Sequence, residues 1–370
     1  MLKFMLMDKF SVYIPKLHKL KKSGHFAVLN KTNKMIKILL TGASGTVGKE
    51  VLRQLCEYPD EIEITVFDRL FSGSEDFYKK AGRDFKIVYG DISEEKDIRE
   101  ACSDKDVIIH LAAIIPPLAD KFPHLAEAVN ITGTRNLVRC AEELSPDAFF
   151  IYSSSISVYG DRIADPWIKT NDSLIPSDRD EYARTKIAAE KIIINSKLSW
   201  TIFRLTAIMG TNNHKPSPLM FHMPLNTPME IATPEDTGRA FVNALKHLDI
   251  LKSKIYNLGG GEKCRIAYSD FLSRSFEIFG LGSLDFQENA FARKNFHCGY
   301  YEDGDVLNDI LDFRRDSIDD YFNNLKKSIP PGKKIATSIL RRLIKFNLER
   351  QSEPLIAIKT DNKADLQHYF

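Results

Sequence analysis

Residues 37–48 read Lys37-Ile38-Leu39-Leu40-Thr41-Gly42-Ala43-Ser44-Gly45-Thr46-Val47-Gly48, a short apolar run that breaks into three closely spaced glycines. Such a run is typical of a buried strand, and residues 49–58 follow it with a helical pattern. Gly42 permits a tight turn, Gly45 lets the backbone approach a pyrophosphate, and Gly48 lets the helix pack on the strand. The helix N-terminus adds free N–H groups and the positive end of its dipole. This stretch therefore predicts a phosphate-binding turn.

The glycine spacing is GxxGxxG, which differs from the usual GxGxxG dinucleotide fingerprint, and an ordinary glycine-rich turn is the alternative interpretation. The next apolar run, residues 63–67, ends in Asp68, whose carboxylate can accept hydrogen bonds from the adenosine ribose. Arg69 could accommodate a 2′-phosphate, whereas Asp68 repels one, so we expect NAD and keep NADP as the alternative. The residues of the turn that we expect to contact the cofactor are Gly42, Ser44, Gly45, Thr46, Val47 and Gly48.

Two further apolar runs alternate with helical patterns. Residues 85–89 end in Gly90-Asp91-Ile92, and residues 106–111 lead into His110-Leu111-Ala112-Ala113. Strands that are apolar on both faces and alternate with helices predict a parallel sheet covered on both sides. The small residues after the second run suit close passage beside a cofactor, so we expect contacts from Leu111, Ala112 and Ala113.

Several features leave two interpretations open. His110 could be catalytic, but a hydrogen-bonded structural role is favoured. The apolar loop 114–118 could be a lid or could pack against a second lobe, and residues 220–225 could line an apolar pocket or pack that lobe. His297 and Cys298 suggest a metal, but no third ligand has a suitable spacing, so packing is favoured.

A serine-rich segment, residues 153–160, follows the apolar run 148–152, and hydroxyls at the carboxyl end of a parallel strand lie where α/β sheets bind ligands. Tyr182-Ala183-Arg184-Thr185-Lys186 then opens a helix that runs to about Asn195. Tyr182 and Lys186 lie one turn apart on one face. We expect the ammonium to lower the tyrosine pKa from its usual value of about 10, so that the phenol can transfer a proton near neutral pH.

This order of motifs resembles the extended short-chain dehydrogenase/reductase family, which includes nucleotide-sugar epimerases, dehydratases, reductases and 3β-hydroxysteroid dehydrogenases. The resemblance spans roughly residues 36–322 and is carried by residues 41–48, 90–92, 110–113, 130–134, 153–160, 182–186 and 256–260. It implies hydride transfer to or from a nicotinamide cofactor. The implied roles are a hydrogen bond to the substrate oxygen for Ser155, general acid/base for Tyr182, the nicotinamide ribose for Lys186, the pyrophosphate for Gly42, Gly45 and Gly48, the adenosine ribose for Asp68, and the adenine for Asp91 with Ile92. Dimers are common in this family, so we expect a homodimer.

Two departures from the family pattern narrow the substrate. Ser155-Ile156-Ser157 stands where family dehydratases carry Thr-Asp-Glu, which disfavours a 4,6-dehydratase. The segment between Gly210 and Met229 is shorter than the insertion with which nucleotide-sugar enzymes usually hold the nucleotide.

The composition is that of an ordinary soluble enzyme, without a membrane span or signal peptide, so we expect a cytoplasmic location. The five scattered cysteines indicate reduced thiols. Residues 1–34 hold eight Lys and one Asp, and residues 326–350 hold eight Lys or Arg and one Glu, so each segment has a net charge of +7. These ends could touch an anionic membrane surface or nucleic acid. The favoured interpretation is solvated tails. Because Met35 precedes the first strand, an upstream translation start is an alternative origin of the first one.

The sequence thus predicts an α/β protein with a doubly wound parallel sheet (Rossmann fold) and a smaller C-terminal substrate-binding lobe. The expected function is an NAD(P)-dependent oxidoreductase for an alcohol or ketone, with no nucleic-acid partner. The rivals are a nucleotide-sugar 4-epimerase that retains NAD, and a non-catalytic NAD(P)-binding sensor or scaffold. The predicted parts are a basic extension (1–34), the cofactor domain (35–207, completed by about 229–260), the lobe (208–228 and 261–328) and a basic tail (329–370), loose from about Lys359.

Overall fold

The computed structural model describes residues 35–71, 73–81, 83–211 and 215–370. The basic segment 1–34 lies outside these residues. Within the part of the chain that the structure describes, no helix is long and apolar enough to cross a membrane.

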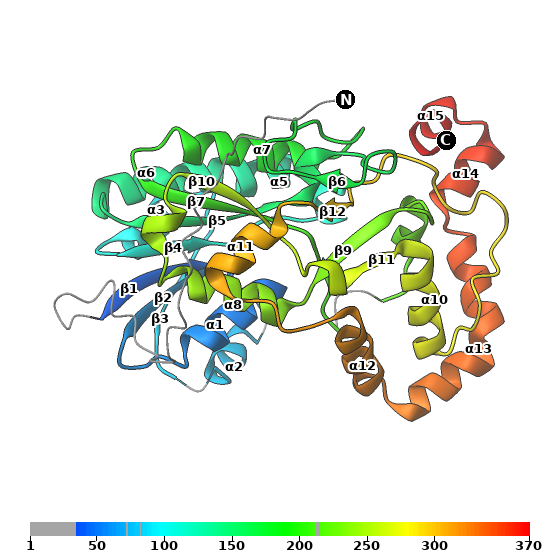
Figure 1. The fold of residues 1–370 in the computed structure, drawn as a ribbon, viewed down its shortest axis with the longest axis horizontal. Coiled ribbons are helices and arrows are strands. Elements are labelled where there is room, and N and C mark those ends of the chain that lie inside the picture. Colours follow the sequence, from blue (N-terminus) through cyan, green and yellow to red (C-terminus); the bar gives the residue numbers. More distant parts are fainter. Residues whose placement is uncertain (1–34, 72, 82, 212–214) are drawn as a thin grey trace, which may run out of the picture.

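A parallel sheet of seven strands forms the larger half of the molecule, in the order β10-β7-β5-β4-β1-β2-β3 (Figure 1). The chain order reverses between β1 and β4, and in such sheets ligands bind in the crevice beyond the carboxyl ends of the strands at that point. The predicted fold class is confirmed. The strands are β1 (Ile36–Thr41), β2 (Ile62–Asp68), β3 (Lys86–Tyr89), β4 (Val107–His110), β5 (Phe149–Ser155), β7 (Ser199–Leu205) and β10 (Lys254–Leu258).

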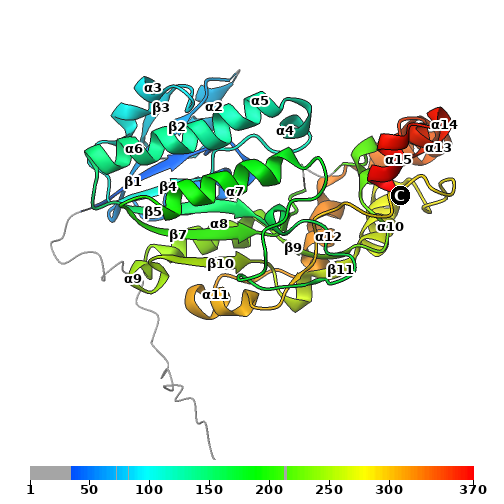
Figure 2. The same cartoon turned by 90° about the horizontal axis from the view of Figure 1, so that it is seen from above.

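Helices cover both faces of this sheet (Figures 1 and 2). The two cores beneath them are built from strand residues that are buried on alternate faces, such as Leu40 on one side and Leu39 on the other. One face carries α1 (Thr46–Leu55), α2 (Ser74–Lys79), α8 (Pro234–Ala244) and α11 (Gly304–Leu311), and the other carries α3 (Glu95–Arg99), α6 (Thr134–Leu144) and α7 (Glu181–Ile194). The short helix α9 (Leu248–Leu251) precedes β10.

The helix boundaries differ from the sequence pattern at two places. Helix α1 begins at Thr46, directly after the glycine turn, three residues before the pattern that predicted it. The sequence pattern predicts one helix from about Leu125 to Leu144. The structure divides this stretch into α5 (Pro123–Ala126), a π-helical segment η2 (Glu127–Gly133) and α6, preceded by α4 (Leu118–Lys121). A π-helical segment adds a residue to a turn, which the apolar period does not reveal.

The smaller lobe has its own core, rich in aromatic rings and methionines, such as Phe221, Phe276 and Met220. Strand β9 pairs with β8 and β11 in a separate three-stranded sheet, and β12 pairs with β6. The elements are β6 (Trp167–Ile168), β8 (Ala207–Ile208), η4 (Pro218–His222), β9 (Pro228–Ala232), β11 (Arg265–Ala267), α10 (Tyr268–Phe279), β12 (Tyr300–Tyr301) and α12 (Ile318–Ser328). The segment 220–225 packs into this core, as one of its two interpretations held.

The chain beyond Ile329 forms three helices, α13 (Pro331–Glu349), α14 (Glu353–Thr360) and α15 (Lys363–Tyr369), which lie along the outer margin of the lobe (Figure 1). The expectation of a loose end from Lys359 was therefore wrong. Leu348 and Leu355 enter the lobe core, and Tyr369 packs with Ala292 and Ala357. These contacts join residues distant in sequence, which a local apolar pattern cannot reveal.

The last helix also contacts the segment that precedes α7. Arg179 donates to Asp365 at 2.7 Å and to the carbonyl of Ala364 at 2.9 Å, and His368 Nδ1 lies 3.0 Å from Asp178 Oδ2. The C-terminal residues thus contact the segment that leads into α7, the helix that carries Tyr182.

Candidate active site

The glycine turn between β1 and α1 is tight enough to require glycine at two positions. Gly42 has φ +73°, and a Cβ there would lie 2.6 Å from the Ala112 nitrogen. A Cβ on Gly48 would lie 2.1 Å from the Gly42 carbonyl oxygen. Helix, turn and β4 therefore approach one another as closely as the glycine pattern predicts.

The N-terminus of α1 suits an anion. Its N-cap residue, Gly45, makes no side-chain capping bond, and the first turn holds no acidic residue. The first amides of a ten-residue helix are thus left to a ligand, and the dipole favours negative charge there. Ser44 lies in the turn, and Thr46 and Val47 are the first two residues of α1; their contact with a cofactor stays a prediction.

Asp68 ends β2 and lies beside this turn. Its Oδ2 accepts from the Ser44 N–H at 2.8 Å and from the Tyr78 hydroxyl at 2.7 Å, and its Oδ1 accepts from the Arg69 N–H at 2.8 Å. A carboxylate has about four acceptor positions, so Asp68 keeps capacity for a ribose hydroxyl. Sequence reasoning did not identify Tyr78, which comes from α2 and orients this carboxylate.

The other predicted cofactor contacts lie at the ends of β3 and β4. Ser93 donates to Asp91 Oδ1 from its N–H at 3.0 Å and from its hydroxyl at 2.7 Å, which lowers the pKa of Asp91. Ile92 is 4% exposed and packs against Gly133. Leu111, Ala112 and Ala113 are all half-buried and follow β4, with Ala112 against the glycine turn.

His110 is a structural histidine. It is fully buried, its Nδ1 lies 2.8 Å from Thr41 Oγ1, and its Nε2 lies 3.0 Å from Thr134 Oγ1. Burial lowers its pKa to about 3, so it is neutral at physiological pH and ties β1 to α6.

Asn130 lies in the π-helical segment and ties three parts of the site together. Its amide accepts from the Ile114 N–H at 2.8 Å and donates to the Ile114 carbonyl at 2.9 Å and to Thr185 Oγ1 at 2.9 Å. The Asn130 side chain thus connects the apolar loop after β4 with helix α7.

Ser155, Tyr182 and Lys186 converge at the carboxyl end of β5. A hydrogen bond joins Tyr182 and Ser155, and the Lys186 ammonium lies 5.6 Å from the Tyr182 ring centroid. Lys186 is 1% exposed and donates to the Ser153 carbonyl at 2.7 Å. Ser155 Oγ accepts from the N–H and the hydroxyl of Ser157 at 3.2 and 3.0 Å, so its own proton is free to point elsewhere.

The pKa values of Tyr182 and Lys186 differ from the expectation. Burial raises the pKa of Tyr182, against the opposing effect of its hydrogen bond with Ser155, whereas a lowered value was expected. Burial also lowers the pKa of Lys186 to about 7, although Glu190 raises it in part. The ammonium that was expected to act on the phenol is itself destabilised by the same burial.

A buried polar network lies behind these residues. Glu190, one turn after Lys186 on α7, accepts from Arg204 Nε at 2.9 Å and Nη2 at 2.7 Å, and from the Ser154 hydroxyl at 2.5 Å. Arg204 also donates to the Tyr159 hydroxyl at 2.8 Å, and both charged partners are at most 3% exposed. Sequence reasoning missed this pair, although Tyr182, Lys186 and Glu190 share a helix face at spacings of four.

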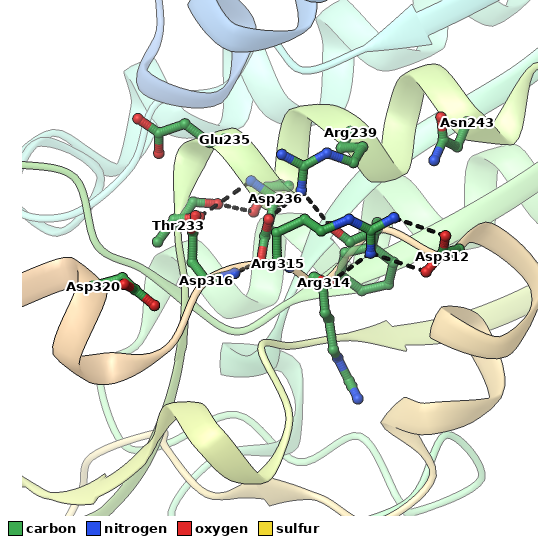
Figure 3. A network of polar contacts seen from close by, with 12 residues as sticks. Thr233, Glu235, Asp236, Arg239, Asn243, Asp312, Arg314, Arg315, Asp316 and Asp320 are labelled. Atoms are coloured by element: carbon green, nitrogen blue, oxygen red, sulfur yellow. Dashed lines mark hydrogen bonds and ion pairs between the residues drawn. The ribbon is translucent and has the colours of Figure 1, made fainter. Parts of the chain in front are cut away.

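A second network fixes the lobe to the sheet-side helix α8 (Figure 3). Asp236 accepts from Arg239 and from the N–H groups of Arg315 and Asp316 at 2.8 and 3.0 Å, and Thr233 donates to Asp316 at 2.6 Å. A cavity of about 370 Å³ adjoins it, where burial raises the pKa of Glu235. Ser155, Tyr182 and Lys186 do not line this cavity. Its lining residues are Met209, Gly210, Thr211, Thr233, Glu235, Tyr321, Asn324, Lys327 and Ser328.

His297 and Cys298 do not form a metal site with other described residues. His297 Nδ1 lies 2.9 Å from Asp180 Oδ2, and Asp180 caps α7 by accepting from the Ala183 N–H at 2.8 Å. Cys298 is 4% exposed, and burial raises the pKa of its thiol to about 12.

Comparison with known proteins agrees with this architecture. Residues 39–204 match the model of the 3-beta hydroxysteroid dehydrogenase/isomerase family. A 3-beta-hydroxysteroid dehydrogenase of Mycolicibacterium neoaurum is 30% identical over 166 residues, which cover 43% of this chain and 42% of that protein. The 3 beta-hydroxysteroid dehydrogenase type 7 of Rattus norvegicus is 24% identical over 163 residues, covering 43% of this chain and 48% of that protein. The chain thus spans less than half the length of these relatives.

A solved structure extends the likeness to the lobe. The UDP-glucuronic acid 4-epimerase from Bacillus cereus, in complex with UDP-glucuronic acid and NAD, has a TM-score of 0.65 and 19% identity, covering 80% of this chain and 100% of that one. At this identity the likeness concerns the fold. The family match is confined to residues 39–204, and the solved structure shows that the likeness in fold continues beyond that stretch.

Proposed function

We propose that this protein is an NAD-dependent oxidoreductase that interconverts an alcohol and a ketone. The observation that carries the proposal is the group at the end of β5, where Tyr182 is hydrogen-bonded to Ser155 and lies one helical turn before the buried Lys186. The matched relatives are named as enzymes that act on 3β-hydroxysteroids, so we take hydroxysteroids as the first substrate class.

The residues present fit a dinucleotide. The uncapped N-terminus of α1 would hold the pyrophosphate. At Gly42 the turn has no side chain, so its backbone lies close to the backbone of Ala112. Asp68 would accept from the adenosine ribose and disfavour a 2′-phosphate, which supports NAD over NADP. When bound, NAD supplies the hydride acceptor or donor at its nicotinamide.

The chain's own groups would handle the proton and the orientation of the substrate. Tyr182 would take the proton of the alcohol, or return it to the ketone oxygen, while Ser155 donates a hydrogen bond to the same oxygen. Such proton transfer is typically worth about 10²- to 10⁴-fold in rate. The Lys186 ammonium would stabilise the phenolate while the proton is away, and Glu190 would favour the charged form of Lys186.

Tyr182→Phe tests this proposal, because it removes one oxygen and keeps the ring. We expect turnover of a 3β-hydroxysteroid with NAD to fall by at least about 10²-fold, with NAD affinity unchanged by equilibrium titration. Tyr256→Phe, which removes the same oxygen from β10, is the matched control and should keep full turnover. Unchanged turnover in Tyr182→Phe would overturn the catalytic role.

The two rival functions give different results in the same assays. A 4-epimerase would be purified with NAD bound and would convert UDP-glucuronic acid to its epimer, whereas the oxidoreductase binds NAD reversibly and consumes it stoichiometrically. A sensor or scaffold would bind NAD and turn over neither substrate. The proposed division into cofactor domain and lobe, the homodimer and the cytoplasmic location stay predictions.

A further inference from the structure

Helix α13 carries an apolar stripe that points away from the molecule. Leu348 and Ile344, on its inner side, join the lobe core. On the opposite side, Ile335, Ile339 and Phe346 are 61%, 76% and 55% exposed, and Leu343 beside them is 57% exposed. Single exposed apolar residues are ordinary, but a continuous stripe of large ones along a helix marks an interaction surface.

Basic side chains surround this stripe. Arg342 and Arg350 flank it on the helix, and Lys333 and Lys334 lie at its N-terminal end. None of these four forms an ion pair with the residues that the structure describes, whereas Lys345, on the inner side, pairs with Asp285. Glu349, the one acidic residue of the helix, is engaged with Gln287. The outer face therefore combines apolar surface with uncompensated positive charge.

Position and shape leave this face open to a flat partner. Helix α13 lies in the lobe, at the end of the molecule away from the seven-stranded sheet (Figures 1 and 2). Its 19 residues make a rod about 28 Å long. A rod of this length can lie in a bilayer interface with its apolar side in the headgroup and acyl boundary and its cations beside the lipid phosphates.

We propose that the outer face of α13 docks this protein on an anionic lipid surface. Charge decides between this and the other possible occupants. A second copy laid stripe to stripe would bring the flanking arginines of both copies together. Residues 1–34 carry a net charge of +7 from eight Lys and one Asp, so they share the sign of the helix. An anionic bilayer offers both the apolar layer and the opposite charge.

Vesicle flotation of the full chain tests the proposal, with phosphatidylcholine vesicles compared with mixed phosphatidylcholine and phosphatidylglycerol vesicles. We expect binding to the mixed vesicles that weakens with added salt, and little binding to phosphatidylcholine alone. Arg342→Gln with Arg350→Gln should weaken binding by roughly 30-fold, and Ile339→Ser with Phe346→Ser by at least about 10-fold.

Matched controls separate the face from general effects. Ile250→Ser with Val306→Ser removes apolar groups that are 49% and 52% exposed elsewhere, and Lys96→Gln with Lys252→Gln removes two exposed cations from the sheet half. Both control proteins should bind like the parent, and all variants should keep its circular dichroism.

Three results would overturn the proposal: no binding to the mixed vesicles, equal binding to both vesicle types, or equal losses in the control variants. A dimer in sedimentation velocity that Ile339→Ser with Phe346→Ser dissociates, without vesicle binding, would likewise overturn it and assign the face to a second copy. Because these readouts involve no turnover, they are independent of the proposed function.

Discussion

The interior of the sheet half and the interior of the small lobe are stabilised by different kinds of contact. The sheet half has mainly aliphatic cores on both faces and encloses a charged pair, Glu190 with Arg204, whose charged groups are paired inside the protein. The lobe core is made largely of aromatic rings and methionines. Hydrogen bonds of fixed geometry position reacting groups, whereas thioethers and rings adapt to different shapes. The difference suggests that the proposed chemistry belongs to the sheet half and the choice of substrate to the lobe.

The largest expected effect tests whether the buried pair holds the sheet half. Arg204→Met leaves the Glu190 carboxylate unpaired at 1% exposure and should lower the free energy of unfolding by about 3–5 kcal/mol in urea titrations. The control is Arg315→Met, whose pair with Asp312 is 48% and 81% exposed, with a loss of at most about 1 kcal/mol. Similar losses in the two variants would erase the distinction between a buried and a peripheral network.

The next effect depends on pH. The pKa of Lys186 is lowered from 10.5 to about 7 in the folded protein, so between these values the unfolded chain binds more protons than the folded one. Stability of the parent should therefore rise with pH across this window, relative to Lys186→Met, by up to about 1.4 kcal/mol per pH unit. Urea titrations at several pH values measure this slope. In the control Lys252→Met, which changes an exposed lysine, stability should depend on pH as it does in the parent. If Lys186→Met also showed the parent's pH dependence, the charge of Lys186 would not be buried as assigned.

A smaller effect concerns the cofactor. Asp68→Asn removes the charge that disfavours a 2′-phosphate and should narrow the preference for NAD over NADP by about tenfold, or about 1.4 kcal/mol. Fluorescence titrations with both nucleotides measure it. Asp76→Asn, an exposed neighbour on α2, should keep the parent's preference. If Asp68→Asn also retains the parent's preference for NAD over NADP, another residue makes the ribose contact.

The smallest effect sharpens the description of the lobe. Gly332 lies in the first turn of α13, and a Cβ there would meet nothing within 4 Å. Gly332→Ala should raise the free energy of unfolding by about 0.5–1 kcal/mol. Gly280→Ala is the contrasting variant, because φ is +83° and a Cβ would lie 2.7 Å from the Lys334 carbonyl, so it should destabilise. A loss of stability in Gly332→Ala would argue against the helix start at Pro331.

Local signals explain why the sheet half could be predicted. The glycine turn, Asp68 at the end of β2 and the Tyr182 to Lys186 spacing each depend on a few neighbouring residues. The parallel sheet followed from strands apolar on both faces, and the strand order that the structure adds places β1, β2 and β4 side by side. The roles of Ser155, Tyr182 and Lys186 stay predictions.

Contacts between distant residues explain what could not be predicted. Arg204 meets Glu190 across two elements, and Tyr78 reaches Asp68 from another helix, so neither pairing follows from spacing along one segment. Burial also changed the sign of the expected shift at Tyr182, because a sequence names the neighbouring charge without giving the desolvation.

The π-helical segment η2 has a consequence for insertions and deletions. It carries an extra residue between α5 and α6, and each residue of a helix turns the chain by about 100°. Deleting one residue there would restore an ordinary helix and rotate everything on one side of the deletion about the axis. Asn130 could then no longer face Ile114 and Thr185 while Thr134 faces His110. The segment sets the angular phase between two halves of one helix, so a single-codon deletion should be more harmful here than most substitutions.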